Sequence, residues 1–176
     1  MNIATLAEKY LAWCEKHRSP RTVVWYRGHL DGFLAHLGSP LLVTELKPYH
    51  VVEWVDAHPA WGDTYKRGAI MAVQRACNWA GELGYIEDSP IKRIKKPAAR
   101  RRDNPMSPDD FQAVLGFLAE GDPFRELLVF VWNTGVRPQE ARHIEARHVQ
   151  FDRERIVIPA EEAKGKRYPR IIYLHA

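Results

Sequence analysis

The sequence predicts a mainly α-helical protein with two parts: a four-helix bundle, followed by a smaller α+β part that ends in a β-hairpin. Three observations predict this fold class. Apolar residues recur at three- and four-residue steps through most of residues 1–90, as in helices that bury one face. A stretch rich in Lys, Arg and Pro, residues 91–108, interrupts this pattern. Near residue 155 the apolar period becomes two, which is typical of strands.

The first two helices have clear local signals. An apolar stripe begins at Ile3 and predicts an opening amphipathic helix. Ser19 followed by Pro20 reads as an N-cap and the first residue of a second helix. Gly38 ends that helix, because glycine readily adopts the left-handed conformation of a helix C-terminus.

Two further helices complete the predicted bundle. The third is short and begins at Pro48, and the fourth runs from about Asp63 to Leu83, where Gly84 ends it. The residues of the fourth helix that we expect to face inward are Ala69, Val73, Ala76, Ala80 and Leu83. Four helices of this length form a bundle large enough to fold alone.

The second part opens with another capped helix. Ser107, Pro108 and Asp110 form a variant of the capping box. The expected core stripe of this helix is Phe111, Val114, Leu115 and Leu118. The next helix follows Pro123 and contains the segment LLVFVW, which is apolar on nearly all sides, so we expect it to be buried.

A helix and a hairpin are expected at the end of the chain. The helix runs from Pro138 to about His148. Two strands follow, over Arg155–Pro159 and Tyr168–Leu174, joined by a loop that contains Lys164, Gly165 and Lys166.

Composition limits the class of protein. The chain has 176 residues, a formal net charge of +4 and a pI of about 9.1, which favours a polyanionic partner. We find no signal peptide and no apolar run long enough to span a bilayer, so we expect a cytoplasmic protein without membrane contact. Cys14 and Cys77 lie on apolar helical faces without ligands at metal-binding spacing, which indicates buried thiols and neither a metal nor a cofactor.

The Lys- and Arg-rich stretch has two possible interpretations. It contains Lys92, Arg93, Lys95, Lys96, Arg100, Arg101 and Arg102. Such a run can be a solvated connector between domains. Like charges placed so closely repel one another, however, and a connector does not need them. We therefore expect these side chains to meet phosphates.

Arg137 stands where folding alone does not require an arginine. Because Pro138 restricts the preceding residue to extended geometry, Arg137 should be the N-cap of the helix that follows. A cation beside the positive end of a helix is unfavourable unless an anion shares the site, and arginine binds phosphate in bidentate fashion. Glu140 can cap the same helix or orient Arg137. The alternative is a surface arginine beside a capping glutamate.

These residues resemble a known family. TGVRPQEARHIEARHVQFDRERIVI resembles the first active-site motif of the tyrosine recombinases, or phage integrases, and AEEAKGKRYPRIIYL is similar to the hairpin that follows it. AVQRACNWAGELGYIEDSPIKRIKKP is similar to the end of the family's helical core-binding domain. The resemblance implies a SAM-like core-binding bundle over residues 1–96, a basic linker over 97–106, and the first part of a truncated catalytic domain over 107–176.

The resemblance also implies roles. Arg137 would hold the scissile phosphate of double-stranded DNA, Glu140 would support it, and Lys164 would donate a proton to the departing 5′-oxygen, with Lys166 as the other possible register. Cations can stabilise phosphoryl transfer in this way without a metal. The residues of the fourth helix that could contact DNA are Lys66, Arg67 and Arg75. The complete protein would be tetrameric on DNA, and this chain alone monomeric.

Part of the family's catalytic set is missing from this sequence. None of the eight histidines is followed by an arginine three residues later, and no tyrosine stands where the family has its nucleophile. We therefore expect an inactive DNA-binding fragment of a recombinase. A DNA-binding module without chemistry that occupies recombination sites is the alternative, and a helical interaction protein without a DNA role is a third interpretation.

Overall fold

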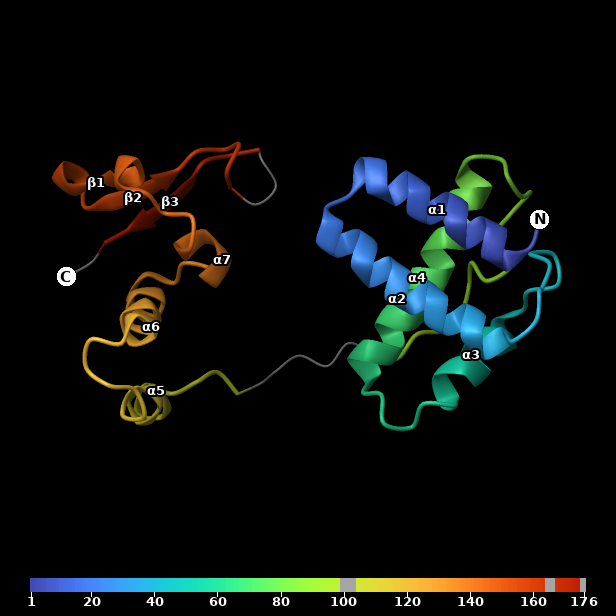
Figure 1. The fold of residues 1–176 in the computed structure, drawn as a ribbon, viewed down its shortest axis with the longest axis horizontal. Coiled ribbons are helices and arrows are strands. Elements are labelled where there is room, and N and C mark those ends of the chain that lie inside the picture. The colour runs from blue at the N-terminus through green and yellow to red at the C-terminus, as the bar shows by residue number, and fades with distance from the viewer. Residues whose placement is uncertain (99–103, 164–166, 175–176) are drawn as a thin grey trace. The chain divides into compact units, whose positions relative to one another are not determined.

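The computed structural model describes residues 1–98, 104–163 and 167–174. The chain divides into two compact units, residues 1–103 and 104–176, and each has its own hydrophobic core (Figure 1). Among the helices of the described residues, none combines the length and apolar composition that crossing a membrane would require.

The first unit is the predicted four-helix bundle. Its helices are α1 (Ile3–His17), α2 (Pro20–Leu37), α3 (Pro48–Asp56) and α4 (Asp63–Glu82). Helices α1 and α2 lie side by side, and α4 packs against the other three (Figure 1). The expected caps are confirmed: Ser19 accepts a hydrogen bond from the Thr22 N–H at 3.3 Å, and Gly38 has a φ of 64°.

The core of this unit extends beyond the four helices. Ile91 and Ile94 are 0% and 7% exposed, so the first residues of the Lys-, Arg- and Pro-rich stretch pack into the core of the first unit. Both cysteines are buried and unbonded, as expected. One residue of the expected α4 stripe is misplaced: Leu83 is 56% exposed, because the helix ends before it and the backbone turns at Gly84, which has a φ of 74°.

The second unit begins with α5 (Pro108–Leu115) and α6 (Pro123–Thr134). The predicted capping box is present, since Ser107 and Asp110 exchange side-chain and backbone hydrogen bonds. Two packing predictions are wrong. Val114 is 39% exposed, and no residue of α6 is fully buried, because only part of that apolar helix has a neighbour among the described residues.

A short helix and a three-stranded antiparallel sheet complete the unit. Helix α7 (Pro138–Ala141) is followed by the 3-10 turns η1 (Ala146–His148) and η2 (Phe151–Arg153). The sheet has the order β1 (Val149–Gln150), β2 (Arg155–Ile158) and β3 (Arg170–Tyr173). The predicted hairpin of two strands is therefore confirmed, while β1 was not predicted.

The predicted helix over residues 138–148 is wrong beyond Ala141. The chain turns there because His148 is drawn into the core, where it is 2% exposed. Its Nδ1 accepts the Glu145 N–H at 3.1 Å, and its Nε2 lies 3.2 Å from Glu162 Oε2. In a continued α-helix the Glu145 N–H would donate to the backbone carbonyl four residues earlier. It would then not be available to donate to the His148 ring.

Candidate functional site

Arg137 and Glu140 form a closed pair at the start of α7. Arg137 is the N-cap, as predicted, with extended backbone angles of φ −70° and ψ 140°. Its backbone N–H donates to Glu140 Oε2 at 3.2 Å, and its Nη1 donates to Glu140 Oε1 at 2.7 Å. The Glu140 side chain is only 8% exposed, whereas that of Arg137 is 55% exposed. Glu140 thus holds one edge of the guanidinium and leaves the rest accessible to a ligand.

Glu140 is held in its charged form. Burial alone would raise the pKa of this carboxyl, but the hydrogen bonds from Arg137 and the charges of Arg137 and Arg170 more than offset burial, so the pKa lies below its usual value. The Nε of Arg170, on β3, lies 3.9 Å from Glu140 Oε2. Because α7 has only four residues, these side chains and not a helix dipole dominate the local electrostatics.

A cavity of about 320 Å³ adjoins this pair. Its lining residues are Arg137, Gln139, Glu140, His143, Ile158 and Glu162. Five of these six residues are polar or charged, and Arg137 supplies the cationic group. In the part of the chain that the structure describes, no group of three His, Cys, Asp or Glu side chains is placed to hold a metal ion. The exposed part of the Arg137 guanidinium is the group in this cavity that could bind an anion.

Glu162, which lies in the described part of the hairpin loop, lines this cavity. Lys164 and Lys166 lie outside the described residues, but Glu162, just before them, forms an ion pair with Arg147 at 3.0 Å, and its Oε2 lies 3.2 Å from His148 Nε2. Ala163 is buried in the core of the second unit. The segment after β2 is therefore anchored up to Ala163, the residue that precedes Lys164.

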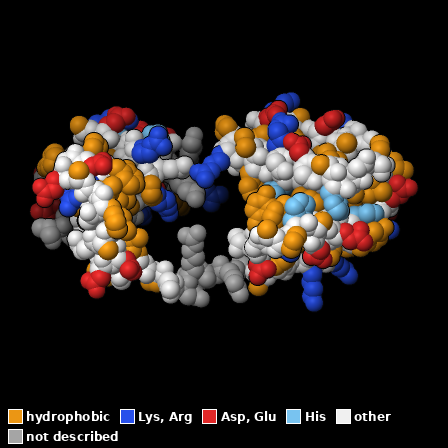
Figure 2. Space-filling view, turned by 60° about the horizontal axis from the view of Figure 1, so that its bottom comes forward, with side chains coloured by type: hydrophobic (Ala, Val, Ile, Leu, Met, Phe, Trp, Pro, Cys, Tyr) orange, Lys and Arg blue, Asp and Glu red, His pale blue; other side chains and the backbone are white. Residues whose placement is uncertain are grey.

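Several basic residues expected to contact DNA have partners within the first unit. Lys66 lies 3.9 Å from Asp56, Arg75 lies 3.0 Å from Glu82, and Arg67 donates to the Pro97 carbonyl at 2.9 Å. In Figure 2 the Lys and Arg side chains on this face of the first unit are interspersed with Asp and Glu and do not form one patch. Each of these three basic side chains of α4 therefore already has a partner within the first unit.

The basic segment of residues 92–96 is more favourable for binding an anion. Arg93 and Lys95 are exposed, and neither has an ion-pair partner among the described residues. Lys92 is paired with Asp88 at 3.2 Å, and Lys96 donates to Gln74 Oε1 at 2.6 Å. Arg100, Arg101 and Arg102 lie outside the described residues.

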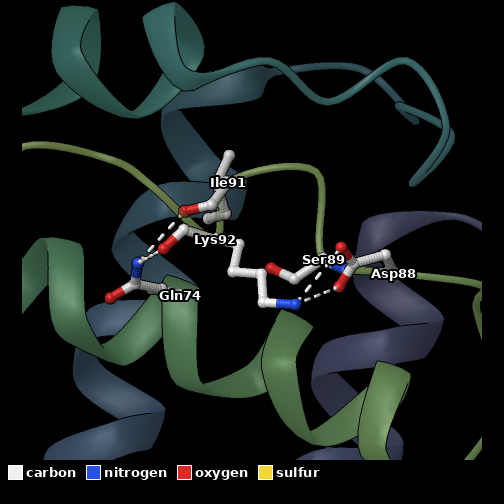
Figure 3. A network of polar contacts seen from close by, with 5 residues as sticks. All are labelled: Gln74, Asp88, Ser89, Ile91 and Lys92. Atoms are coloured by element: carbon white, nitrogen blue, oxygen red, sulfur yellow. Dashed lines mark hydrogen bonds and ion pairs between the residues drawn. The ribbon is translucent and has the colours of Figure 1, made fainter.

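Gln74 fixes the backbone of this segment. Its Nε2 donates to the carbonyls of Ile91 at 3.1 Å and Lys92 at 2.8 Å, and Figure 3 shows the amide pointing from α4 at both carbonyl groups. The side chain is buried, so these bonds are shielded from water. The segment that carries Arg93 and Lys95 is consequently ordered before any ligand arrives.

Sequence reasoning missed Gln74 and Arg170. Gln74 lies on a helix face with no distinguishing pattern, so no sequence signal pointed to it. Arg170 did carry a signal, because it stands two residues before Ile172 and therefore on the same, core-facing side of its strand. A cation at such a position requires a buried partner.

Comparison with known proteins shows which solved structures share this fold. No family model matches the sequence, and no curated protein matches it. The chain is similar in structure to a lambda integrase tetramer bound to a Holliday junction, with a TM-score of 0.79 and 12% identity over 99% of this chain and 52% of that one. The chain has the tyrosine recombinase fold.

Two more solved structures share the tyrosine recombinase fold with this chain. A lambda integrase dimer bound to a COC' core site matches 98% of this chain and 49% of its own, with a TM-score of 0.77 and 11% identity. The Tn1549 transposon integrase in complex with transposon right end DNA matches 99% of this chain and 61% of its own, with a TM-score of 0.72 and 14% identity. The chain thus spans about half to three fifths of the length of these proteins.

Proposed function

We propose that this chain is the DNA-binding N-terminal portion of a site-specific tyrosine recombinase, which in full length cuts and rejoins DNA through a phosphotyrosine intermediate. The observation that carries the proposal is Arg137, an exposed guanidinium fixed at one edge by the buried Glu140, in a chain with the tyrosine recombinase fold. Double-stranded DNA is the proposed partner; the Tn1549 transposon integrase was solved in complex with transposon right end DNA, which supports DNA as the ligand.

In this proposal each unit has its own task. Residues 1–96 bind DNA, residues 97–106 link the domains, and residues 107–176 form the first part of the catalytic domain. Arg137 holds the scissile phosphate and offsets the charge that develops on its oxygens, a contribution worth roughly 3–4 kcal/mol for one fixed donor. Glu140 orients Arg137, and Lys164 protonates the departing 5′-oxygen. The complete protein would act as a tetramer on DNA.

A DNA-binding module without chemistry is a second candidate. Both candidates require duplex DNA binding, so this property is tested first.

A salt titration of binding to a random duplex tests the proposal. If about five phosphates are neutralised, log K should fall with log salt at a slope of about −4 to −5. Replacing Arg93 and Lys95 by Gln should weaken this slope by about 2, since each phosphate contact contributes about 0.9. The same replacement at the exposed Lys16 and Arg21, which changes the net charge equally, should leave the slope unchanged.

Two results would contradict the proposal. A slope near zero for the unaltered chain would mean that it does not bind DNA through phosphates. Equal slopes for the two double variants would mean that residues 92–96 are not part of the DNA-binding surface.

A further inference from the structure

We propose that Arg170 is a positioning residue of the phosphate site: it shares the buried carboxylate of Glu140 with Arg137, and thereby leaves Arg137 with charge available for a DNA phosphate. This inference rests on the proposed function of Arg137 as a phosphate ligand. It adds a residue of β3 to a site that the sequence motif places only at the start of α7 and in the hairpin loop.

The position of Arg170 in the sheet is the first observation. The register of β2 and β3 places Ile156 opposite Ile172 and Ile158 opposite Arg170. The three isoleucines are 2–3% exposed and form the core of the second unit. Arg170 thus occupies a core-facing position, where a cation loses hydration and requires compensation from an acidic partner.

Glu140 is that partner. Arg170 Nε lies 3.9 Å from Glu140 Oε2. The Nε atom is itself buried and has no hydrogen-bond partner among the described residues, although the side chain as a whole is 41% exposed. A buried guanidinium N–H without an acceptor is costly, so the carboxylate is held toward it. Glu140 therefore joins the start of α7 to β3.

The net charge of the Arg137, Glu140 and Arg170 side chains determines how strongly they attract a phosphate. A single arginine paired with a single carboxylate has no net charge, and such a pair attracts a phosphate weakly. Here two guanidinium groups, from Arg137 and Arg170, lie within 4 Å of one carboxylate, so the cluster keeps a net charge of +1. Arg170 supplies the charge that Glu140 would otherwise remove from Arg137.

The test compares Arg170→Gln with Arg167→Gln in the 176-residue chain. Arg167 is an exposed arginine of the same hairpin without an ion pair to any described residue, so this variant matches the charge loss. The first readout is the acid titration of the Glu140 carboxyl carbon by NMR. The second is the change in the Arg137 Nε–H signal when a short DNA duplex is added, with the signal assigned through its absence in Arg137→Ala.

The expected result is specific to Arg170. Arg170→Gln should raise the pKa of Glu140 and reduce the Arg137 response to DNA, whereas Arg167→Gln should change neither. Arg170→Lys, which keeps the charge, should partly restore the lowered pKa of Glu140 and the Arg137 response to DNA. It is the variant to measure if Arg170→Gln does not fold. Overall DNA affinity should stay within about threefold, because one phosphate contact among several is weakened.

The failures of the two proposals are distinguishable. Identical Glu140 titrations in Arg170→Gln and Arg167→Gln would overturn the assignment of Arg170. A wild-type chain that binds DNA without any change in the Arg137 signal would overturn the role of Arg137 as a phosphate ligand, and with it the proposed function of the site.

Discussion

Replacing Glu140 by Gln should destabilise the second unit at neutral pH. The carboxylate accepts two hydrogen bonds from Arg137, one from Nη1 at 2.7 Å and one from the backbone N–H at 3.2 Å. Glutamine has the same shape but only one oxygen, so it can keep one of these bonds and must turn its NH₂ group toward the other donor.

The size of the effect follows from burial. A hydrogen bond to a charged group contributes about 1.5–3 kcal/mol, but Arg137 is 55% exposed, and water screens part of this interaction. We therefore expect a loss of about 1–2 kcal/mol. For a domain of this size the melting temperature should fall by about 5–15 °C.

The pH dependence gives a second, independent check. Because the pKa of Glu140 is lowered in the folded chain, its stabilisation is fully present above the pKa of an unfolded glutamate, about 4.3, and is lost as the pH falls through the lower folded value. The stability difference between the unaltered chain and Glu140→Gln should therefore be constant from about pH 5 to 7 and shrink below about pH 4.

Urea unfolding followed by the backbone amide signals of Ile156 and Ile172 measures this, since both residues lie in the core of the second unit. The control is Glu161→Gln, at an exposed glutamate to which no described residue is paired. A Glu140→Gln variant as stable as the control at pH 7 would refute the reasoning. So would a difference that persists unchanged down to about pH 2, because the carboxylate would then not be its source.

Two further predictions concern the basic segment and the chemistry. Gln74→Leu removes the donor from two carbonyls, so it should destabilise the first unit by about 1–3 kcal/mol and speed hydrogen exchange of the Ile94 amide. The control Gln112→Leu, at an exposed glutamine, should have neither effect. An unchanged Ile94 exchange rate in Gln74→Leu would show that Gln74 does not order the segment. Incubation of the 176-residue chain with a nicked suicide duplex should give no covalent protein–DNA band on a denaturing gel, because the sequence contains only part of the family's phosphate-binding set. A surviving band would mean that Tyr168 or Tyr173 acts as a nucleophile.

The sequence by itself determined most helix boundaries. Ser19, Gly38 and Ser107 mark helix ends through hydrogen bonds or backbone angles that involve residues at most a few positions away. The N-cap position of Arg137 was predicted for the same reason, since Pro138 restricts its neighbour directly. These features depend only on residues that are close together in the chain, so a single sequence is sufficient to predict them.

The tertiary structure decided whatever depends on residues distant in the chain. The helix after Pro138 stops early because His148 is buried beside Glu162, and Ile91 and Ile94 of the Lys-, Arg- and Pro-rich stretch pack into the first core. The link between Arg170 and Glu140 depends on the register of a hairpin and on how the sheet packs beside α7. Burial and ion pairing are set by which elements meet in space, and the order of residues along the chain specifies that only through the complete fold.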